Sequence, residues 1–252
     1  MAYAEFSPSG RWLALSSDRG VELLDCESLR VESDLGVDPS GPAIWSPSED
    51  ELITYGIFSH ICRWPTESKS DGTTLLGPPQ PILLNPRMAR LGADNQIPQH
   101  DGRFCHWQSD GRFLYFSDNR HGRVFRMEVA TGKAEMLFEL RGAYRLAVSP
   151  SGEMLALTSL PREDTTVWNV AQKQQLAHFP SCGNPTFTSD GRFLCVASRD
   201  EVVVFNTLDW AEVRRWTTDT VHPRHSTPLA AHPNGKLLAI AVSGNRVRLV
   251  DI

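Results

Sequence analysis

The sequence predicts an all-β chain built from one repeated four-stranded unit, and two observations lead to this prediction. A Ser-Asp-Gly or Ser-Pro-Ser-Gly turn recurs along the chain, and an apolar run of strand length follows it. The clearest copy spans Phe187 to Asn206 and reads F-T-S-D-G-R-F-L-C-V-A-S-R-D-E-V-V-V-F-N. Its runs are continuous rather than alternating, and they are rich in β-branched and aromatic residues. This pattern favours strands covered on both faces, as in sheets that stack on one another.

Six copies of the unit are visible, and their spacing predicts a ring of sheets. The residues that lead into the six turns are Phe6, Trp45, Trp107, Val148, Phe187 and Ala231. Four of the five intervals lie near the repeat of about 40–45 residues that is typical of a four-stranded propeller blade. The remaining interval is longer by roughly half a repeat, and we interpret residues 85–102 as an insertion. The sequence therefore predicts a single β-propeller domain with repeats at 3–36, 42–84, 103–140, 144–179, 184–217 and 229–252.

Each copy supplies the strands of one blade in chain order. Second strands are expected at 12–15, 52–55, 113–116, 154–157, 193–197 and 237–242, and third strands at 21–25, 61–64, 124–127, 166–168, 202–205 and 247–250. Fourth strands are expected at 29–35, 73–76 with an extension to 81–84, 133–140, 174–179 and 211–217. No fourth strand follows the sixth copy. The last blade is therefore expected to be three-stranded with an exposed edge, or to be completed outside this sequence in a longer chain, which we favour.

The turn, the strand after it and a later strand ending in an apolar-polar pair resemble the WD-repeat β-propeller family, in a divergent form similar to bacterial members. The Trp-Asp pair of that family falls on Leu24-Asp25, Trp64-Pro65, Met127-Glu128, Trp168-Asn169, Phe205-Asn206 and Val250-Asp251. None of these is a literal Trp-Asp, and the family's Gly-His pair has no counterpart. The resemblance implies a non-enzymatic scaffold that binds a protein or peptide partner.

The composition bears on the partners and the cellular compartment that we expect for the protein. The net charge is −5, from 25 basic and 30 acidic residues, and no basic stripe is present, so we expect no nucleic-acid partner. The five cysteines are odd in number and contain no C-x-x-C, which favours free, buried thiols in a reducing compartment. No leader and no apolar run of about 18 residues is visible. We therefore expect a cytoplasmic protein without a membrane partner.

Motifs of catalysis are not visible, so no catalytic residue and no cofactor is predicted. The sequence has no H-E-x-x-H, G-x-S-x-G or phosphate-binding glycine loop. His222, His225 and His232 are close in sequence, but prolines separate them and no fourth ligand is evident, so no metal site is predicted. The tryptophans at repeat positions, Trp12, Trp45, Trp64, Trp107 and Trp168, are expected to pack between blades.

Binding is instead expected on loops at one face of the ring, where rigid folds commonly carry function. The loops before the first strand and between the second and third strands share this face, and the longer ones span 85–102, 117–122, 159–164 and 219–227. They carry the candidate binding residues Arg87, Arg90, Arg120, His121, Arg162, Glu163, Asp164, His222, Arg224 and His225. Their arginines would suit an acidic peptide or a phosphorylated partner, while ordinary solvated loops remain the alternative interpretation.

An enzyme is the competing hypothesis, namely a propeller hydrolase or lactonase with inward-pointing His, Asp or Glu at the central channel. The first strands of the blades are expected to begin near Tyr3, Ala43, Phe104, Tyr144, Thr186 and Leu229. These residues are apolar or neutral, so the predicted channel is poor in ligands. The sequence therefore favours the scaffold over the enzyme.

Overall fold

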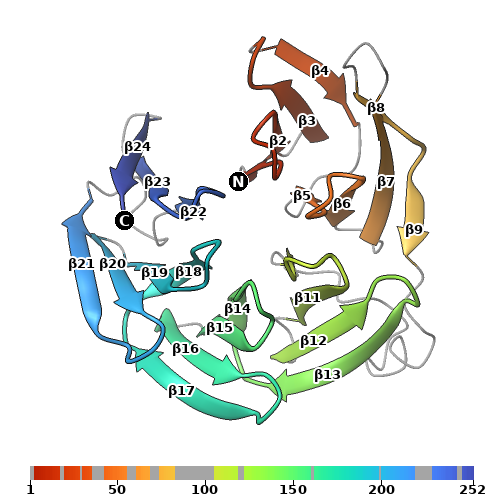
Figure 1. The fold of residues 1–252 in the computed structure, drawn as a ribbon. Helices are drawn as coiled ribbons and strands as arrows, with labels where there is room; N and C mark the ends of the chain where they lie inside the picture. Colours follow the sequence, from red (N-terminus) through yellow and green to blue (C-terminus); the bar gives the residue numbers. More distant parts are fainter. Residues whose placement is uncertain are drawn as a thin grey trace. The chain divides into compact units, whose positions relative to one another are not determined.

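Six antiparallel sheets follow one another along the chain (Figure 1). The structure is a computed structural model that describes residues 3–17, 20–28, 30–35, 43–55, 61–68, 74–82, 105–118, 122–159, 162–198, 200–218, 229–242 and 246–252, and none of these lies in a helix. The chain groups into two compact units. The first comprises Met1–Arg120 and Phe125–Met136, and the second comprises His121–Val124 and Leu137–Ile252, so the boundary runs through the third sheet.

The first unit holds the first two sheets and most of the third. The first sheet has the order β1-β2-β3-β4, with strands at Tyr3–Phe6, Trp12–Ser17, Gly20–Asp25 and Arg30–Asp34. The second contains β5 to β9, at Ala43–Trp45, Glu51–Tyr55, Ile61–Ser68, Thr74–Leu76 and Gln80–Ile82. The third has the order β10-β11-β12-β13, at Cys105–Trp107, Phe113–Asp118, Arg123–Glu128 and Lys133–Glu139.

The second unit holds the last three sheets. The fourth has the order β14-β15-β16-β17, at Ala143–Val148, Met154–Ser159, Asp164–Asn169 and Gln174–Phe179. The fifth has the order β18-β19-β20-β21, at Gly183–Phe187, Phe193–Ala197, Glu201–Asn206 and Glu212–Thr217. The sixth has three strands within the described residues, β22-β23-β24, at Leu229–Ala231, Leu237–Val242 and Arg246–Asp251.

These strands agree closely with the repeat read from the sequence, with one departure in the second sheet. Its single expected outer strand is two short strands, β8 and β9, which pair with opposite ends of the same β7. Gly77, Pro78 and Pro79 lie between them, and the Gly77 amide donates to Pro65 O at 2.7 Å. Proline has no amide hydrogen to donate to a ladder, so the strand breaks where the prolines lie.

Neighbouring sheets of the first unit pack their apolar side chains against each other. Trp12 and Leu23 of the first sheet contact Trp45, Leu52 and Trp64 of the second in one buried cluster. A second cluster joins the other face of the second sheet to the third, and it contains Ile44, Ile53, Cys105, Trp107, Leu114 and Phe125. Burial of each side chain of this size stabilises the folded chain by about 1.5–3 kcal/mol. The prediction that the repeated tryptophans pack between blades is confirmed for these four.

The second unit is built in the same way. Val167 and Phe179 of the fourth sheet pack against Phe187, Leu194 and Val196 of the fifth. Aromatic rings extend this cluster outward, because Phe179 stacks on Phe205 at 4.1 Å and meets Trp210 at 6.0 Å between ring centroids. A further cluster joins the fifth sheet to the sixth, with Cys195, Val202, Val204, Leu238 and Ile240 at its centre.

The same tight turn joins the first two strands of every sheet. Its fourth residue has a positive φ of 58–77°, and that residue is Gly10, Glu49, Gly111, Gly152, Gly191 or Gly235. In each turn this residue donates its amide hydrogen to the carbonyl of the first residue, at 2.8–3.0 Å. Left-handed backbone is unstrained only for glycine, so the recurring Gly in the sequence follows from the turn. Glu49 is the one exception among these six turns.

A different turn explains a second glycine of the sequence. Gly122, just before β12, has a φ of 67°, and its carbonyl accepts the amide of Leu140 at 2.5 Å. A Cβ at this position would lie 2.7 Å from Arg141 Cα and closer still to Leu140 O. Since both neighbours are backbone atoms, no side-chain rotation would relieve the clash.

We predict that Gly122→Ala lowers the free energy of unfolding by roughly 3 kcal/mol or more, because strain at positive φ adds to a clash with backbone. The matched control is Gly10→Ala, which has a similar φ of 77° but no heavy atom within 4 Å of the added Cβ. Gly10→Ala is expected to lower the free energy of unfolding by about 1 kcal/mol. Urea denaturation of both variants measures the difference, and equal losses would contradict the assignment of a backbone clash.

Candidate functional site

The predicted binding face is described at one place, the connection between β15 and β16. Arg162, Glu163 and Asp164 lie there, with Arg162 exposed and the other two half-buried. Glu163 has a φ of 56°, an uncommon conformation for a residue other than glycine. The remaining candidates lie outside the described residues: Arg87, Arg90, Arg120, His121, His222, Arg224 and His225. Their role in binding stays a prediction.

Asp164 has a structural task within this face. Its Oδ1 accepts the amide of Ser181 at 2.9 Å, and its Oδ2 lies 3.6 Å from His178 Nε2. The next residue, Thr165, contacts Thr158 Oγ1 at 2.8 Å and donates to the carbonyl of Cys182. These bonds tie the connection before β16 to the connection before β18. Arg162 is thus the exposed cation of a loop whose base is fixed.

At the opposite end of the sheets, polar side chains are used to build the turns themselves. The hydroxyls of Ser7, Ser46, Ser149 and Thr188 each accept the amide of the residue five positions later, at 3.0–3.2 Å. Adjacent turns also touch each other. Ser9 donates its amide and its hydroxyl to the carboxylate of Glu49, the hydroxyl at 3.0 Å. This end of each sheet therefore has a fixed length and a fixed hydrogen-bond pattern.

The residue that ends the third strand, at the position compared above with the Asp of a WD repeat, has a clear role in this structure. Asp25 Oδ1 accepts the amides of Glu27 and Ser28 at 2.9 and 2.8 Å, and the Ser28 bond is the main reason why the pKa of Asp25 is lowered. Asn169 and Asn206 accept turn amides at 2.8 and 2.9 Å in the same way. In these three sheets the side chain at this position caps the turn between the third and fourth strands.

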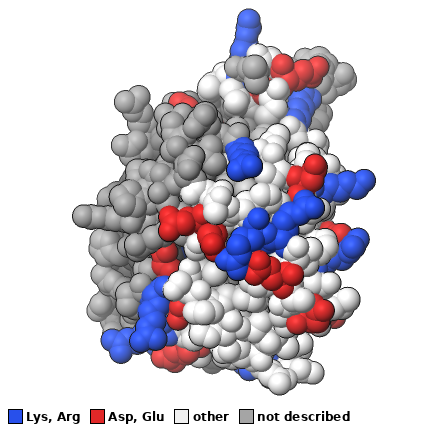
Figure 2. Space-filling view, turned by 90° about the vertical axis from the view of Figure 1, so that its left-hand side faces the viewer, with Lys and Arg blue, Asp and Glu red and all other residues white. Residues whose placement is uncertain are grey.

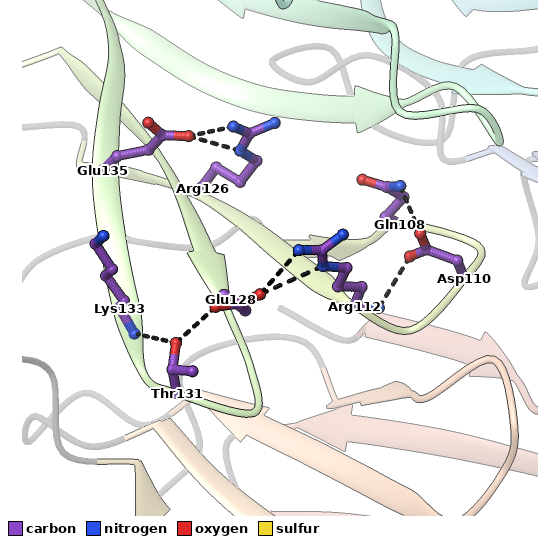
Figure 3. Close-up of polar contacts among 8 residues, drawn as sticks. All are labelled: Gln108, Asp110, Arg112, Arg126, Glu128, Thr131, Lys133 and Glu135. Atoms are coloured by element: carbon purple, nitrogen blue, oxygen red, sulfur yellow. Dashed lines mark hydrogen bonds and ion pairs between the residues drawn. The ribbon is translucent and has the colours of Figure 1, made fainter.

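In the third sheet, polar side chains bond to one another at the turns and between the strands (Figure 3). Glu128 accepts the hydroxyl of Thr131 at 2.9 Å and pairs with Arg112 at 3.2 Å, and both contacts lower the pKa of Glu128, the Thr131 bond most. Arg126 of β12 pairs with Glu135 of β13 across the strands. These ion pairs lie between partners within one sheet. We therefore assign this cluster to stability rather than to ligand binding.

The first strands of the first unit contain the ionisable groups Glu5 and Cys105; the sequence predicted Cys105 as a buried thiol but did not single out Glu5. Glu5 of β1 is half-buried, and desolvation raises the pKa of Glu5 to about 8, against the lowering effect of a hydrogen bond from the Trp45 amide. Cys105 of β10 is buried; desolvation raises the pKa of its thiol, and the charge of Glu5 adds to this effect. Glu5 is thus a carboxyl group that is largely protonated at neutral pH.

His106 is the neighbour of Cys105, but it points to the other face of its sheet. Cys105 and Trp107 pack into the cluster with the second sheet, and alternate residues of a strand face opposite sides. The Nδ1 atom of His106 lies 2.8 Å from Trp107 O, and desolvation lowers the pKa of His106. Glu5 and His106 each lie inside one of the expected inner strands, past the starting residues. An alignment of the inner strands by their turns, rather than by their starts, would have found them.

Three other observations bear on the chemistry of the described residues. No group of three or more His, Cys, Asp or Glu side chains among them is arranged to hold a metal ion. All five cysteines are free thiols, and Cys105 and Cys195 are buried. In the part of the chain that the structure describes, no helix has the length and apolar character to cross a membrane.

Comparison with known proteins supports the fold. No protein-family model and no curated protein matches the chain. Hydrazine synthase from Kuenenia stuttgartiensis is similar over 98% of this chain and 75% of that chain, with 15% identity and a TM-score of 0.67. The β-propeller domain of Cps50 (Swd1) from Myceliophteria thermophila is similar over 99% of this chain and 82% of that chain, with 13% identity and a TM-score of 0.64. The chain is an all-β, six-bladed β-propeller.

The raised pKa of Glu5 predicts an unusual pH dependence of stability. The folded-state pKa is about 8 and the ordinary value is 4.5, so the stabilising contribution is complete below about pH 4.5 and is lost as pH rises through about 8. We expect Glu5→Gln to gain stability relative to the parent between about pH 5 and pH 9, by on the order of 2 kcal/mol for this half-buried group. Urea denaturation across this range measures the difference.

The control for this prediction is Glu22→Gln, which changes an exposed carboxyl of β3 in the same sheet. This variant is expected to change the free energy of unfolding by less than about 0.5 kcal/mol, because the Glu22 side chain is exposed. Parallel pH profiles of the parent and Glu5→Gln would show that Glu5 titrates normally and would contradict the assignment.

Proposed function

We propose that this chain is a non-enzymatic scaffold of WD-repeat type that binds a protein or peptide partner through loops on one face of the propeller. One observation carries the proposal. At one end of the sheets every turn between the first two strands has the same length and bonding, whereas the connections at the other end range from residues 18–19 to residues 83–104. Loops of variable length on a rigid scaffold are where propellers and comparable folds place recognition.

The partner that suits this face best is an acidic or phosphorylated peptide. The predicted arginines of the face belong to different loops, and Arg162 is exposed on a loop that Asp164 fixes through Ser181. Guanidinium groups bind carboxylates and phosphates with paired hydrogen bonds, and a fixed loop loses little freedom on binding. The five free thiols support the further proposal of a reducing, cytoplasmic setting.

The proposal predicts that Arg120→Ala combined with Arg162→Ala weakens the binding of the physiological partner about tenfold, because two charge-assisted contacts are lost. A partner is first identified by affinity capture with the parent chain and is then titrated as a purified protein by calorimetry. The measured quantity is the dissociation constant of the parent and of the double variant.

The matched control is Arg192→Ala, which removes an exposed guanidinium from a turn at the opposite end of the fifth sheet. It is expected to bind as tightly as the parent. Unchanged affinity of the double variant, or an equal loss in Arg192→Ala, would argue against a binding site on the predicted face. Turnover of a substrate by the purified chain would instead favour the enzyme hypothesis.

A further inference from the structure

The third strand of every sheet is held in the same hydrogen-bond register. The residue after the family's Asp position donates its amide to the carbonyl of the residue that ends the first turn, at 2.8–3.1 Å in all six sheets. In the fifth sheet this bond joins Thr207 to Arg192, and in the sixth it joins Ile252 to Lys236. Because antiparallel bonding alternates along a strand, equivalent residues of β20 and β24 present their backbone groups to the same edge.

In the fifth sheet this outer edge is occupied. Val202, Val204 and Asn206 of β20 face β21, and Asn206 donates its amide to Ala211 O at 2.9 Å. The equivalent residues of β24 are Val247, Leu249 and Asp251. In the part of the chain that the structure describes, no fourth strand pairs with them. The one bond described at this edge comes from Arg214 of β21, whose Nη1 donates to Asp251 O at 2.6 Å.

The side chains around this edge indicate what a fourth strand would need. Arg248 of β24 is exposed, and no described carboxylate forms an ion pair with it or with Arg214. Leu249 is 67% exposed. The side of the molecule that faces left in Figure 1, where β21 and β24 lie, carries basic and acidic groups in alternation (Figure 2). A carboxylate would therefore be the best match for a residue opposite Arg248.

Ion pairs between third and fourth strands already occur in this fold. Arg126 of β12 pairs with Glu135 of β13, and Glu201 of β20 pairs with Arg215 of β21. Arg215 stands opposite Val203, the equivalent of Arg248. The third strand of the sixth sheet thus carries the cation of such a pair, Arg248. At the equivalent edge of the fifth sheet, a complete fourth strand is present.

We propose that the outer edge of β24 accepts an extended segment of a partner protein as an antiparallel fourth strand, with an acidic residue opposite Arg248. Backbone bonds to Val247 and Leu249 would hold the segment, and the charge pair would set its register. A second copy of β24 fits less well. The registers centred on Arg248 or Leu249 would bring Arg248 directly or diagonally opposite its own copy, and like charges across a sheet are destabilising.

The test uses the 252-residue chain and two synthetic peptides that derive from β21, whose sequence is E-V-R-R-W-T. The acidic peptide carries Arg215→Glu, which puts glutamate opposite Arg248, and the control peptide keeps the arginine. Amide hydrogen exchange of Val247 and Leu249 is followed by NMR at about 1 mM peptide. We expect the acidic peptide to slow exchange about tenfold and the control peptide to be at least about threefold less effective.

Charge reversal in the protein makes the result specific. In Arg248→Glu the order of the two peptides is expected to invert, so that the arginine peptide protects more. Failure of both peptides to protect these amides, or the same order in both proteins, would overturn the proposal. Protection in the peptide-free chain that grows with protein concentration would assign the edge to a second copy instead. The loop face is not involved, so this outcome is independent of the Arg120 and Arg162 variants.

Discussion

Burial of both faces of a sheet by its neighbours is the interaction on which the rest of this structure depends. Leu52 and Ile53 are adjacent in β6, and both are fully buried. Leu52 packs towards the first sheet and Ile53 towards the third, because successive side chains of a strand point to opposite faces. A single sheet of this size could not offset its ordering entropy. The continuous apolar runs of the sequence follow directly from this double burial.

Double burial also determines where polar residues can be placed. Along the strands, buried hydroxyls can form pairs such as Thr158 with Thr165, whose hydroxyls lie 2.8 Å apart in the buried interior. At the turns they cap backbone amides, as Ser7 and Asp25 do. The sequence positions that look most like motifs are therefore engaged in folding. Under the proposed function, the loop face takes its recognition residues from connections that the repeat does not constrain, such as the one that carries Arg162.

The strands could be predicted from the sequence because the repeat marks them with local signals. Gly191 and Asp190 form a turn that any sheet with this register requires, so β19 was predicted at its observed bounds. The split of β8 from β9 was missed because it depends on how Gly77, Pro78 and Pro79 meet β7, which the repeat does not show. The tie between Asp164 and Ser181 was missed for a similar reason, since the two residues belong to different connections. Glu5 was overlooked because its raised pKa comes from burial in the folded chain, and the Trp45 amide that opposes this shift belongs to another sheet.

The outer edge of β24 differs from that of an outer strand such as β21 in its charged residues. In β21 every residue except Trp216 is exposed, and Glu212, Arg214 and Arg215 give this strand a charged edge. Arg215 is held by Glu201 and Glu212, the latter at 2.6 Å, so its charge stays in place beside the edge. Charged residues on an outer strand discourage pairing with another chain. β24 is the third strand of its sheet, and Val250 is half-buried against the fifth sheet. Among its described side chains, β24 has no comparable set of charges held by ion pairs. Among the described residues, no strand covers the hydrogen-bonding groups at this edge of β24.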